Sequence, residues 1–323
     1  MPVTALPNAR VRWSLPGNGE PGPTCGHQTY LVHSAMNGES HYRPARRTCG
    51  RATCPTCALA PGGWASREAD AITARVLAGR PASARLPIHV VISPAEEFWG
   101  AFERFRRKRL SDGRVVIDSD FGYPKLRAEA YRMARAHGLL GGACIPHHVR
   151  MPTDRWKTKK DGSPSHFRDH CVEGPHFHAI GYGWMSESHP QTERWTVWNL
   201  GVRRSVRATA FYCLTHAAIS SEDLDGTSPM PDLSHPRGPF ETVTWFGSLS
   251  YRVRLTVPED PHAAKCPVCG EEVPLNDWEV ASWVGQGPPP TAPGVCRPNE
   301  WIVERLDLTG GWGQAFAVRE AVA

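Results

Sequence analysis

The feature that most constrains this chain is the spacing of its cysteines, which form two clusters in distant parts of the sequence. The first, in CGRATCPTC, contains Cys49, Cys54 and Cys57, and the second, in KCPVCGEE, contains Cys266 and Cys269. Short spacings of this kind are typical of tetrahedral zinc sites, because neighbouring thiolates can converge on one ion. We therefore predict two structural Zn²⁺ sites.

Each cluster needs further ligands to reach four. Cys25 is favoured as the fourth ligand of the first site, with His27 and His33 as alternatives. Cys296 is predicted to complete three thiolates at the second site, and His262 is its candidate fourth ligand. The isolated cysteines are expected to be small apolar side chains; they are Cys144, Cys171 and Cys213.

Composition indicates the cellular location and the class of binding partner to expect. The sequence has no apolar run of ~18 residues and no apolar segment after its N-terminal charges, so we expect no membrane span and no secretion signal. A cytoplasmic, reducing location follows, where clustered cysteines bind metal more often than they form disulfides. Of the 37 basic residues, six are lysines and 37 − 6 = 31 are arginines, within a net charge of +5. This bias fits a nucleic-acid partner, because guanidinium groups bind phosphates bidentately, or a genome that favours arginine codons.

The sequence divides into four parts. Residues 1–24 are rich in Pro, Gly and Asn and predict a flexible arm. Residues 25–80 are expected to form a zinc module followed by a helix, residues 81–255 the main domain, and residues 256–323 a zinc-knuckle module and tail.

Hydrophobic periodicity predicts the elements of the main domain. Helices are expected within 64–80, 123–142 and 201–219, strands within 86–94, 143–151 and 175–184, and a strand or hairpin within 241–257; residues 152–170 predict a basic loop. From residue 86 onward the order β-α-β-β-α-β indicates an α+β fold with an antiparallel sheet and helices on one face.

Two histidines in GPHFHAIGYG carry the first chemical signal. His176 and His178 are two residues apart on a predicted strand, so their imidazoles project from the same face while Phe177 faces the other way. They form half of a divalent-metal site, or are merely two surface histidines. In the neighbouring predicted strand His147 and His148 face opposite ways, so one of them can complete the site; we favour His147. Three ligands leave positions open for water and a phosphate oxygen.

The second signal is Tyr212 in the helix predicted within 201–219. Val206, Ala210 and Cys213 belong to an apolar stripe, and Tyr212 lies roughly 145° from its centre at 100° per residue. The phenol is thus off the buried side and available for attack on phosphorus, although a tyrosine at the edge of a core would show the same pattern. His216, at i+4, lies on nearly the same side.

These stretches together resemble the HUH endonuclease superfamily, especially the replication initiators of small archaeal plasmids and viruses. The matching segments are HVVISP, GGACIPHHVRM, GPHFHAIGYGW, NLGVRRSVRATAFYCLTHAAI and TVTWFGSLSY, with CGRATCPTC and WASREA before them, so the likeness covers roughly residues 49–270. The resemblance implies an RRM-like or ferredoxin-like central antiparallel sheet with appended zinc modules. It maps His176 and His178 to the metal-binding pair and Tyr212 to the nucleophile.

The resemblance also implies the reaction. Tyr212 would nick single-stranded DNA at a replication origin with Mn²⁺ or Mg²⁺, leaving a 5′-phosphotyrosine and a 3′-OH that primes rolling-circle synthesis with host replication proteins. Some relatives carry a second tyrosine one helical turn on; here that position is His216, which is expected to assist proton transfer or contact phosphate. The alternatives are a transposase or relaxase with the same chemistry, and a non-catalytic zinc-ribbon DNA-binding protein.

Overall fold

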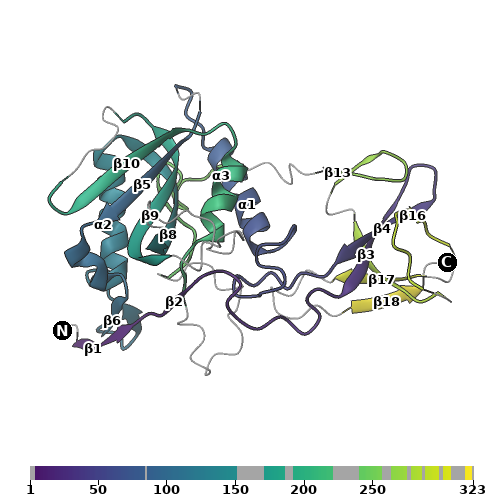
Figure 1. The fold of residues 1–323 in the computed structure, drawn as a ribbon, viewed down its shortest axis with the longest axis horizontal. Helices are drawn as coiled ribbons and strands as arrows, with labels where there is room; N and C mark the ends of the chain where they lie inside the picture. Colours follow the sequence, from purple (N-terminus) through teal and green to yellow (C-terminus); the bar gives the residue numbers. More distant parts are fainter. Residues whose placement is uncertain are drawn as a thin grey trace, which may run out of the picture.

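In the computed structural model the chain forms an α+β fold with two lobes (Figure 1). The larger lobe, at the left of Figure 1, contains the three α-helices of the described residues and a five-stranded sheet; the smaller lobe contains a six-stranded sheet. Among the described residues, no helix combines the length and apolar character needed to cross a membrane. The structure describes residues 4–83, 86–150, 171–185, 192–220, 240–256, 263–274, 278–285, 288–297, 301–306 and 317–321.

The five-stranded sheet is antiparallel throughout, in the order β10-β5-β9-β8-β12. Its longest strands, β8 and β9, lie side by side, and their register pairs His147 directly with His176. Directly paired residues project from the same face, so this register brings the predicted histidines together. The strands are β5 (Ile88–Pro94), β8 (Leu139–Arg150), β9 (Val172–Gly183), β10 (Trp195–Val202) and β12 (Thr244–Gly247).

Helices cover both faces of this sheet rather than the one face expected. Helices α1 (Trp64–Ala78) and α3 (Val206–Thr215) pack together on one face, and α2 (Gly122–Ala136) packs on the other (Figure 1). Strand β9 shows the reason: Phe177 belongs to the core on the α2 side and Ile180 to the core on the α1 and α3 side. Because both faces of β9 are apolar, both must be covered.

All three predicted helices form, but α2 ends earlier than the sequence indicated. The predicted segment ran on to the glycine pair at 141–142, whereas the helix stops at Ala136 and Gly138, with φ of +102°, turns the chain into β8. The glycine pair lies inside β8, where a Cβ on Gly142 would approach the carbonyl oxygen of Ile180 to 2.8 Å. These glycines therefore permit close strand packing rather than end a helix.

Part of the predicted arm is ordered against the larger lobe. Strand β1 pairs with β6, which pairs with β7, and β2 pairs with β11. The indole nitrogen of Trp13 donates to the carbonyl of Phe102 at 3.0 Å, and its ring packs against Tyr123. These elements are β1 (Thr4–Arg10), β2 (Trp13–Ser14), β6 (Arg104–Arg109), β7 (Val115–Ile117), β11 (Ile219–Ser220) and the short 3-10 helix η1 (Glu96–Ala101).

The smaller lobe joins two segments that the sequence placed in separate modules. Its sheet has the order β16-β4-β3-β15-β17-β18, so strands from residues 28–46 pair with strands from residues 279–321. A separate hairpin, β13–β14, lies in the same lobe (Figure 1). The strands are β3 (Gln28–Ser34), β4 (Ser40–Arg46), β13 (Ala263–Lys265), β14 (Glu272–Pro274), β15 (Glu279–Trp283), β16 (Gly294–Val295), β17 (Trp301–Leu306) and β18 (Ala317–Ala321). The predicted basic loop at 152–170 lies outside the described residues.

Candidate active site

Three histidines converge on the sheet face covered by α1 and α3. His147 comes from β8, and His176 and His178 come from β9; one ring nitrogen from each lies within 4.8 Å of the others. The ring centroids of His147 and His178 are 4.2 Å apart, and those of His176 and His178 are 5.0 Å apart. His148, the alternative third ligand, is not part of this group. We call these three residues the histidine triad.

Backbone carbonyls orient two imidazoles of the triad. His176 donates from Nδ1 to the carbonyl of Gly174 at 2.7 Å, and His147 donates from Nε2 to the carbonyl of Cys213 at 2.8 Å. Carbonyl oxygens only accept, so these nitrogens carry the protons and the opposite nitrogens have lone pairs. Metal-binding histidines are typically held by such contacts. The triad thus has the support that a metal site requires.

The third imidazole belongs to a chain of side chains that the sequence did not single out. Arg203 contacts His89 Nδ1 at 3.3 Å, and His89 Nε2 lies 2.7 Å from His178 Nδ1. The His178 Nε2 atom lies in turn 3.1 Å from His176 Nε2. A guanidinium can only donate, so Arg203 donates to Nδ1 of His89. His89 then donates from Nε2 to His178, and His178 donates from Nε2 to His176. His89 is a polar residue between Ile88 and Val90 in an otherwise apolar strand segment, and this is the signal that could have revealed it.

Burial keeps the triad uncharged. It lowers the pKa of His176 to about 4, and the nearby Arg150 guanidinium contributes. Burial, followed by the neighbouring histidines, holds the pKa values of His147 and His178 well below the usual range. Neutral imidazoles are the form that binds metal ions.

A second possible metal group shares His178 with the triad and consists of His89, His178 and Cys213. Burial raises the pKa of the Cys213 thiol to about 12, which disfavours the thiolate that a metal needs. The Nδ1 of His89 also faces the positive charge of Arg203. The triad is therefore the better metal site of the two.

Tyr212 lies on α3 beside the triad. Its side chain is 57% exposed, whereas Ala210, Cys213 and Leu214 of the same helix are fully buried. The Tyr212 ring centroid is 5.1 Å from that of His216, which is 6.3 Å from that of His147. The tyrosine and the triad are thus connected through one intervening imidazole.

A side-chain hydrogen bond at each end and an apolar stripe between them hold α3 in this position. Ser205 caps its N-terminus, where its hydroxyl accepts from the Ala208 amide at 3.1 Å. The buried stripe then packs against α1 and the sheet. At the other end, the Thr215 hydroxyl donates to the Tyr212 carbonyl at 2.7 Å and lies 3.1 Å from His216 Nδ1. This contact occupies Nδ1 of His216 and orients its ring.

Next to the triad, the same sheet face has an arginine and a partly exposed tryptophan that the sequence did not mark. Arg150 donates to the hydroxyl of Ser93 at 2.9 Å, beside the strand segment that carries His176. Trp198 pairs with Val91, which pairs with His178, so all three share this face. Trp198 is 50% exposed. Two strand spacings place it about 10 Å from His178 along the sheet.

The first cysteine cluster brings together Cys25, Cys49, Cys54 and Cys57 and could hold a metal ion such as zinc. The sulfurs of Cys49 and Cys57 are 3.5 Å apart, as are those of Cys54 and Cys25. A ZnS4 tetrahedron has sulfur–sulfur edges of ~3.8 Å. Burial raises the pKa of Cys49, but hydrogen bonds with Arg51, and then with Cys54 and Cys57, outweigh it and bring the value to about 6. A thiolate is therefore accessible near neutral pH.

The second cysteine cluster differs from the predicted set. Cys266 and Cys269 lie with His33 and His41, and these four residues form a possible metal group. Cys296, which the spacing assigned to this site, instead packs beside the small core of Tyr30, Val32 and Ala281 and is not one of the four. The spacing argument failed because both histidines lie in an N-terminal hairpin far away in sequence. His262 lies outside the described residues.

Comparison of the chain with known protein families, with curated proteins and with solved structures finds no match in any of the three. Its function is therefore inferred from the chemistry of these side chains.

Proposed function

We propose that the chain is a metal-dependent endonuclease that nicks single-stranded DNA by attack of Tyr212 on a phosphodiester. The observation that carries the proposal is that the ring of Tyr212 lies against that of His216, which in turn lies beside the ring of His147 in the histidine triad. A metal site beside an exposed tyrosine brings a Lewis acid and a nucleophile together. We further propose the HUH type of fold, which the central position of β9 and its flanking strands support.

The triad fits a divalent metal that accepts imidazole ligands. The 3.1 Å between Nε2 of His176 and Nε2 of His178 is close to the ~3.3 Å that separates two nitrogens on one tetrahedral ion. His147 would contribute Nδ1, because its Nε2 donates to a carbonyl. Magnesium prefers oxygen ligands, so among the two expected cofactors the ligand set favours Mn²⁺. A bound ion would polarise the scissile phosphate and offset its developing charge.

The reaction requires few groups from the protein. The oxygen of Tyr212 forms a bond to phosphorus while the bond from phosphorus to the 3′ oxygen breaks. The phenolic proton passes to His216, and the departing 3′ oxygen takes up a proton from solvent water to become a 3′-OH. Reversal of the step rejoins the strand, because the phosphotyrosine diester conserves the bond energy. Arg150, beside His176, is placed to hold a phosphate oxygen.

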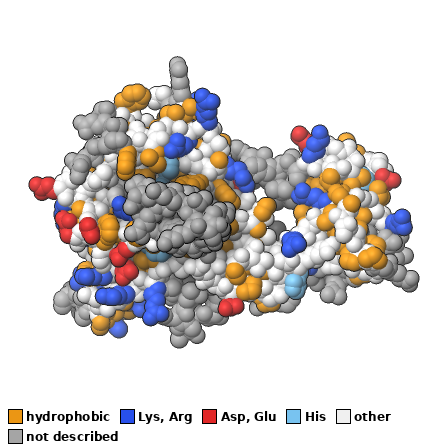
Figure 2. Space-filling view, viewed as in Figure 1, with side chains coloured by type: hydrophobic (Ala, Val, Ile, Leu, Met, Phe, Trp, Pro, Cys, Tyr) orange, Lys and Arg blue, Asp and Glu red, His pale blue; other side chains and the backbone are white. Residues whose placement is uncertain are grey.

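Two further features support a DNA strand as substrate. Trp198 offers an exposed aromatic surface on the face of the triad, and such surfaces stack on unpaired bases. Figure 2 shows Lys and Arg side chains gathered at the lower left of the larger lobe, where Figure 1 places β1 and β6. Arg104, Arg107 and Arg109 of β6 are exposed. Such a basic strand binds the phosphate backbone without reading sequence.

In this proposal the biological role is initiation of rolling-circle replication at an origin, with host proteins extending the 3′-OH. A transposase or relaxase would use the same step. All these roles require a covalent protein–DNA intermediate, which a non-catalytic DNA-binding protein would not form.

The test uses single-stranded oligonucleotides of randomised sequence, labelled at either the 5′ or the 3′ end, with Mn²⁺ and full-length protein. Attack by tyrosine attaches the downstream fragment to the protein, so the 3′ label should become covalently bound while the 5′ label is released. Tyr212→Phe should form no adduct, and the matched control Tyr251→Phe should form as much as wild type. DNA binding without any adduct from wild type would reject the enzyme in favour of a binding protein.

A further inference from the structure

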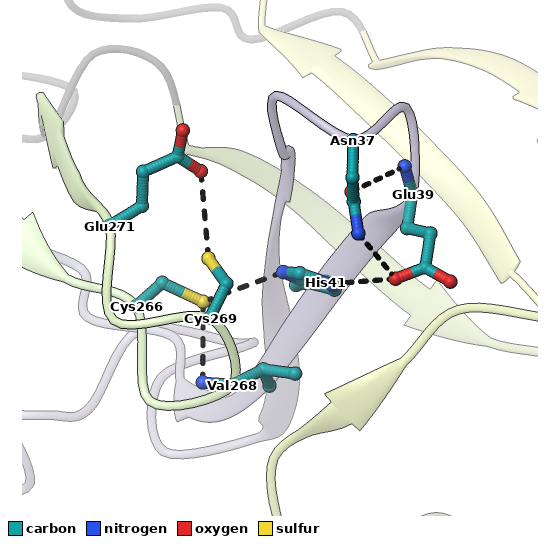
Figure 3. A network of polar contacts seen from close by, with 7 residues as sticks. All are labelled: Asn37, Glu39, His41, Cys266, Val268, Cys269 and Glu271. Carbon is teal, nitrogen blue, oxygen red and sulfur yellow. Dashed lines mark hydrogen bonds and ion pairs between the residues drawn. The ribbon is translucent and has the colours of Figure 1, made fainter.

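A second buried group of metal-binding side chains lies in the smaller lobe, away from the histidine triad. It forms where the hairpin β3–β4 meets the turn between β13 and β14. Three of its four members, His33, His41 and Cys266, are at most 3% exposed, and Cys269 is at the surface. Figure 3 shows His41, Cys266 and Cys269 pointing toward one another from these two hairpins.

His41 has the surroundings of a metal ligand. Its Nδ1 lies 3.8 Å from the sulfur of Cys266, and its Nε2 lies 3.5 Å from a carboxylate oxygen of Glu39 (Figure 3). Asn37 donates to the same oxygen at 2.8 Å and fixes the carboxylate. A carboxylate behind an imidazole orients the ring and makes its other nitrogen a stronger ligand. One nitrogen of His41 is thus held from behind while the other faces the sulfur.

His33 provides independent evidence for an ion. Its Nε2 is buried and has no hydrogen-bond partner among the described residues. A buried polar atom without a partner costs free energy, so such atoms are rare unless water or an ion satisfies them. The His33 ring lies 5.5 Å from that of His41 and 4.6 Å from that of Trp278, which holds it in place. A metal ion between the two hairpins would satisfy this nitrogen.

The cysteine pair has the backbone form of a zinc knuckle. The amide of Val268 donates to the sulfur of Cys266 at 3.4 Å (Figure 3), and the amide of Gly270 donates to the Cys266 carbonyl at 2.9 Å. This amide contact orients the Cys266 sulfur. Glu271 approaches Cys269 at 3.5 Å and adds negative charge to the group. Two thiolates and two imidazoles are ligands that Zn²⁺ binds tetrahedrally.

We propose that His33, His41, Cys266 and Cys269 bind one Zn²⁺, and that this ion cross-links the N-terminal hairpin to the C-terminal segment. The two halves of the site are more than 200 residues apart in the chain, and the five-stranded sheet and three α-helices of the larger lobe lie between them in sequence. The ion therefore holds the chain ends together in one lobe, beside the sheet in which β3 pairs with β15. This site is independent of nicking and stands whether or not Tyr212 is a nucleophile.

The experiment measures zinc per chain in full-length protein that carries His176→Ala and His178→Ala, so that the triad cannot contribute an ion. This protein should hold two equivalents, one in each cysteine-containing group. Adding Cys269→Ser should leave one equivalent, because this change removes a proposed ligand. Cys269 is chosen because it is exposed, so its replacement disturbs packing least. The matched control Cys296→Ser should keep both. With Co²⁺ in place of zinc, the absorption lost on Cys269→Ser should be that of a mixed sulfur and nitrogen site.

Limited proteolysis tests the cross-link in the same proteins. Cys269→Ser and His33→Ala should release a C-terminal fragment faster than the Cys296→Ser control. Two equivalents retained by both His33→Ala and Cys269→Ser would overturn the proposal. So would a single equivalent in the triad-deleted protein that Cys269→Ser does not remove, or loss of an ion with Cys296→Ser.

Discussion

His147 of the histidine triad donates a hydrogen bond to the carbonyl of Cys213, the residue that follows Tyr212, at 2.8 Å. This bond is buried and joins the sheet directly to α3. It orients an imidazole and at the same time fixes the helical turn from which Tyr212 projects. The proposed metal site and the proposed nucleophile are thus positioned by one interaction, and a change at His147 should affect both.

The first prediction concerns the third metal ligand. His147→Ala should weaken Mn²⁺ binding on the order of 100-fold or more, because it removes a ligand and its carbonyl contact. Its neighbour in sequence gives the control, since His148→Ala leaves the triad intact. Titration of Mn²⁺ followed by electron paramagnetic resonance measures both. Equal affinities for the two variants would show that His147 is not a ligand.

The second prediction concerns Arg203. If an ion binds Nε2 of His178, then Nδ1 of His178 must carry the proton and donate to His89 Nε2. His89 would then carry its own proton on Nδ1, against the Arg203 guanidinium that now donates there. Arg203→Gln should therefore tighten Mn²⁺ binding about tenfold, since it also removes a nearby positive charge. Arg204→Gln, at an exposed neighbour, should leave the affinity for Mn²⁺ unchanged. An unchanged affinity in Arg203→Gln would show that Arg203 does not oppose metal binding at His178.

The third prediction concerns pH. Burial lowers the pKa of His176 to about 4, from about 6.5 in an unfolded chain. Between these values the unfolded chain binds the extra proton, so stability is present above pH ~6.5 and is lost as the pH falls toward ~4. The loss is on the order of 3 kcal/mol for this imidazole. Urea unfolding of protein without metal at the triad, at several pH values, measures this loss of stability. The stability of His176→Asn should depend less on pH than that of wild type. Equal pH dependence of the two proteins would contradict the assignment.

The fourth prediction concerns the first cysteine cluster. Cys54→Ser should remove one zinc equivalent and lower the stability of the folded chain, because thiolate sites contribute folding free energy. Cys54 is fully buried, so the loss should be visible as a lower unfolding temperature. Cys144→Ser, at a buried cysteine outside any metal group among the described residues, should keep the zinc. Equal zinc content in both variants would exclude Cys54 as a ligand.

Much of the larger lobe could be predicted from local pattern. The alternation in β9 indicated that His176 and His178 share a face, and the apolar stripe of α3 indicated that Tyr212 is off the buried side; the structure has both features. Period-2 and period-3.6 patterns depend only on residues close together in the chain, so they can be recognised from the sequence alone. The coarse α+β class with antiparallel sheets followed from the same patterns.

Contacts between distant segments could not be predicted. Nothing near His33 or His41 marks them as partners of Cys266, since the pairing of β3 with β15 and of β4 with β16 brings these distant segments together. Likewise, the contact between Arg203 and His89 depends on β5 pairing with both β9 and β10. Short spacing identified Cys49, Cys54 and Cys57 as members of one possible metal group, but it could not identify ligands that the fold brings from distant segments.

The central claim is that Tyr212 attacks DNA, and the structure leaves few competitors among the tyrosines. Tyr182 is fully buried in the core beneath α1 and α3. Tyr251 is 43% exposed, but its ring packs against Trp245 and under the Arg75 guanidinium. Tyr212 alone of these three has an exposed ring beside the triad.

The most direct measurement is peptide mapping of the covalent species formed by full-length protein, Mn²⁺ and single-stranded oligonucleotides. After nuclease and protease digestion, mass spectrometry should find the nucleotide on the peptide that contains Phe211, Tyr212 and Cys213. The Tyr212→Phe protein should bind DNA with unchanged affinity and form no adduct, since only the attacking oxygen is removed. A nucleotide on the peptide of Tyr251 or Tyr182, or an adduct from Tyr212→Phe, would contradict the account.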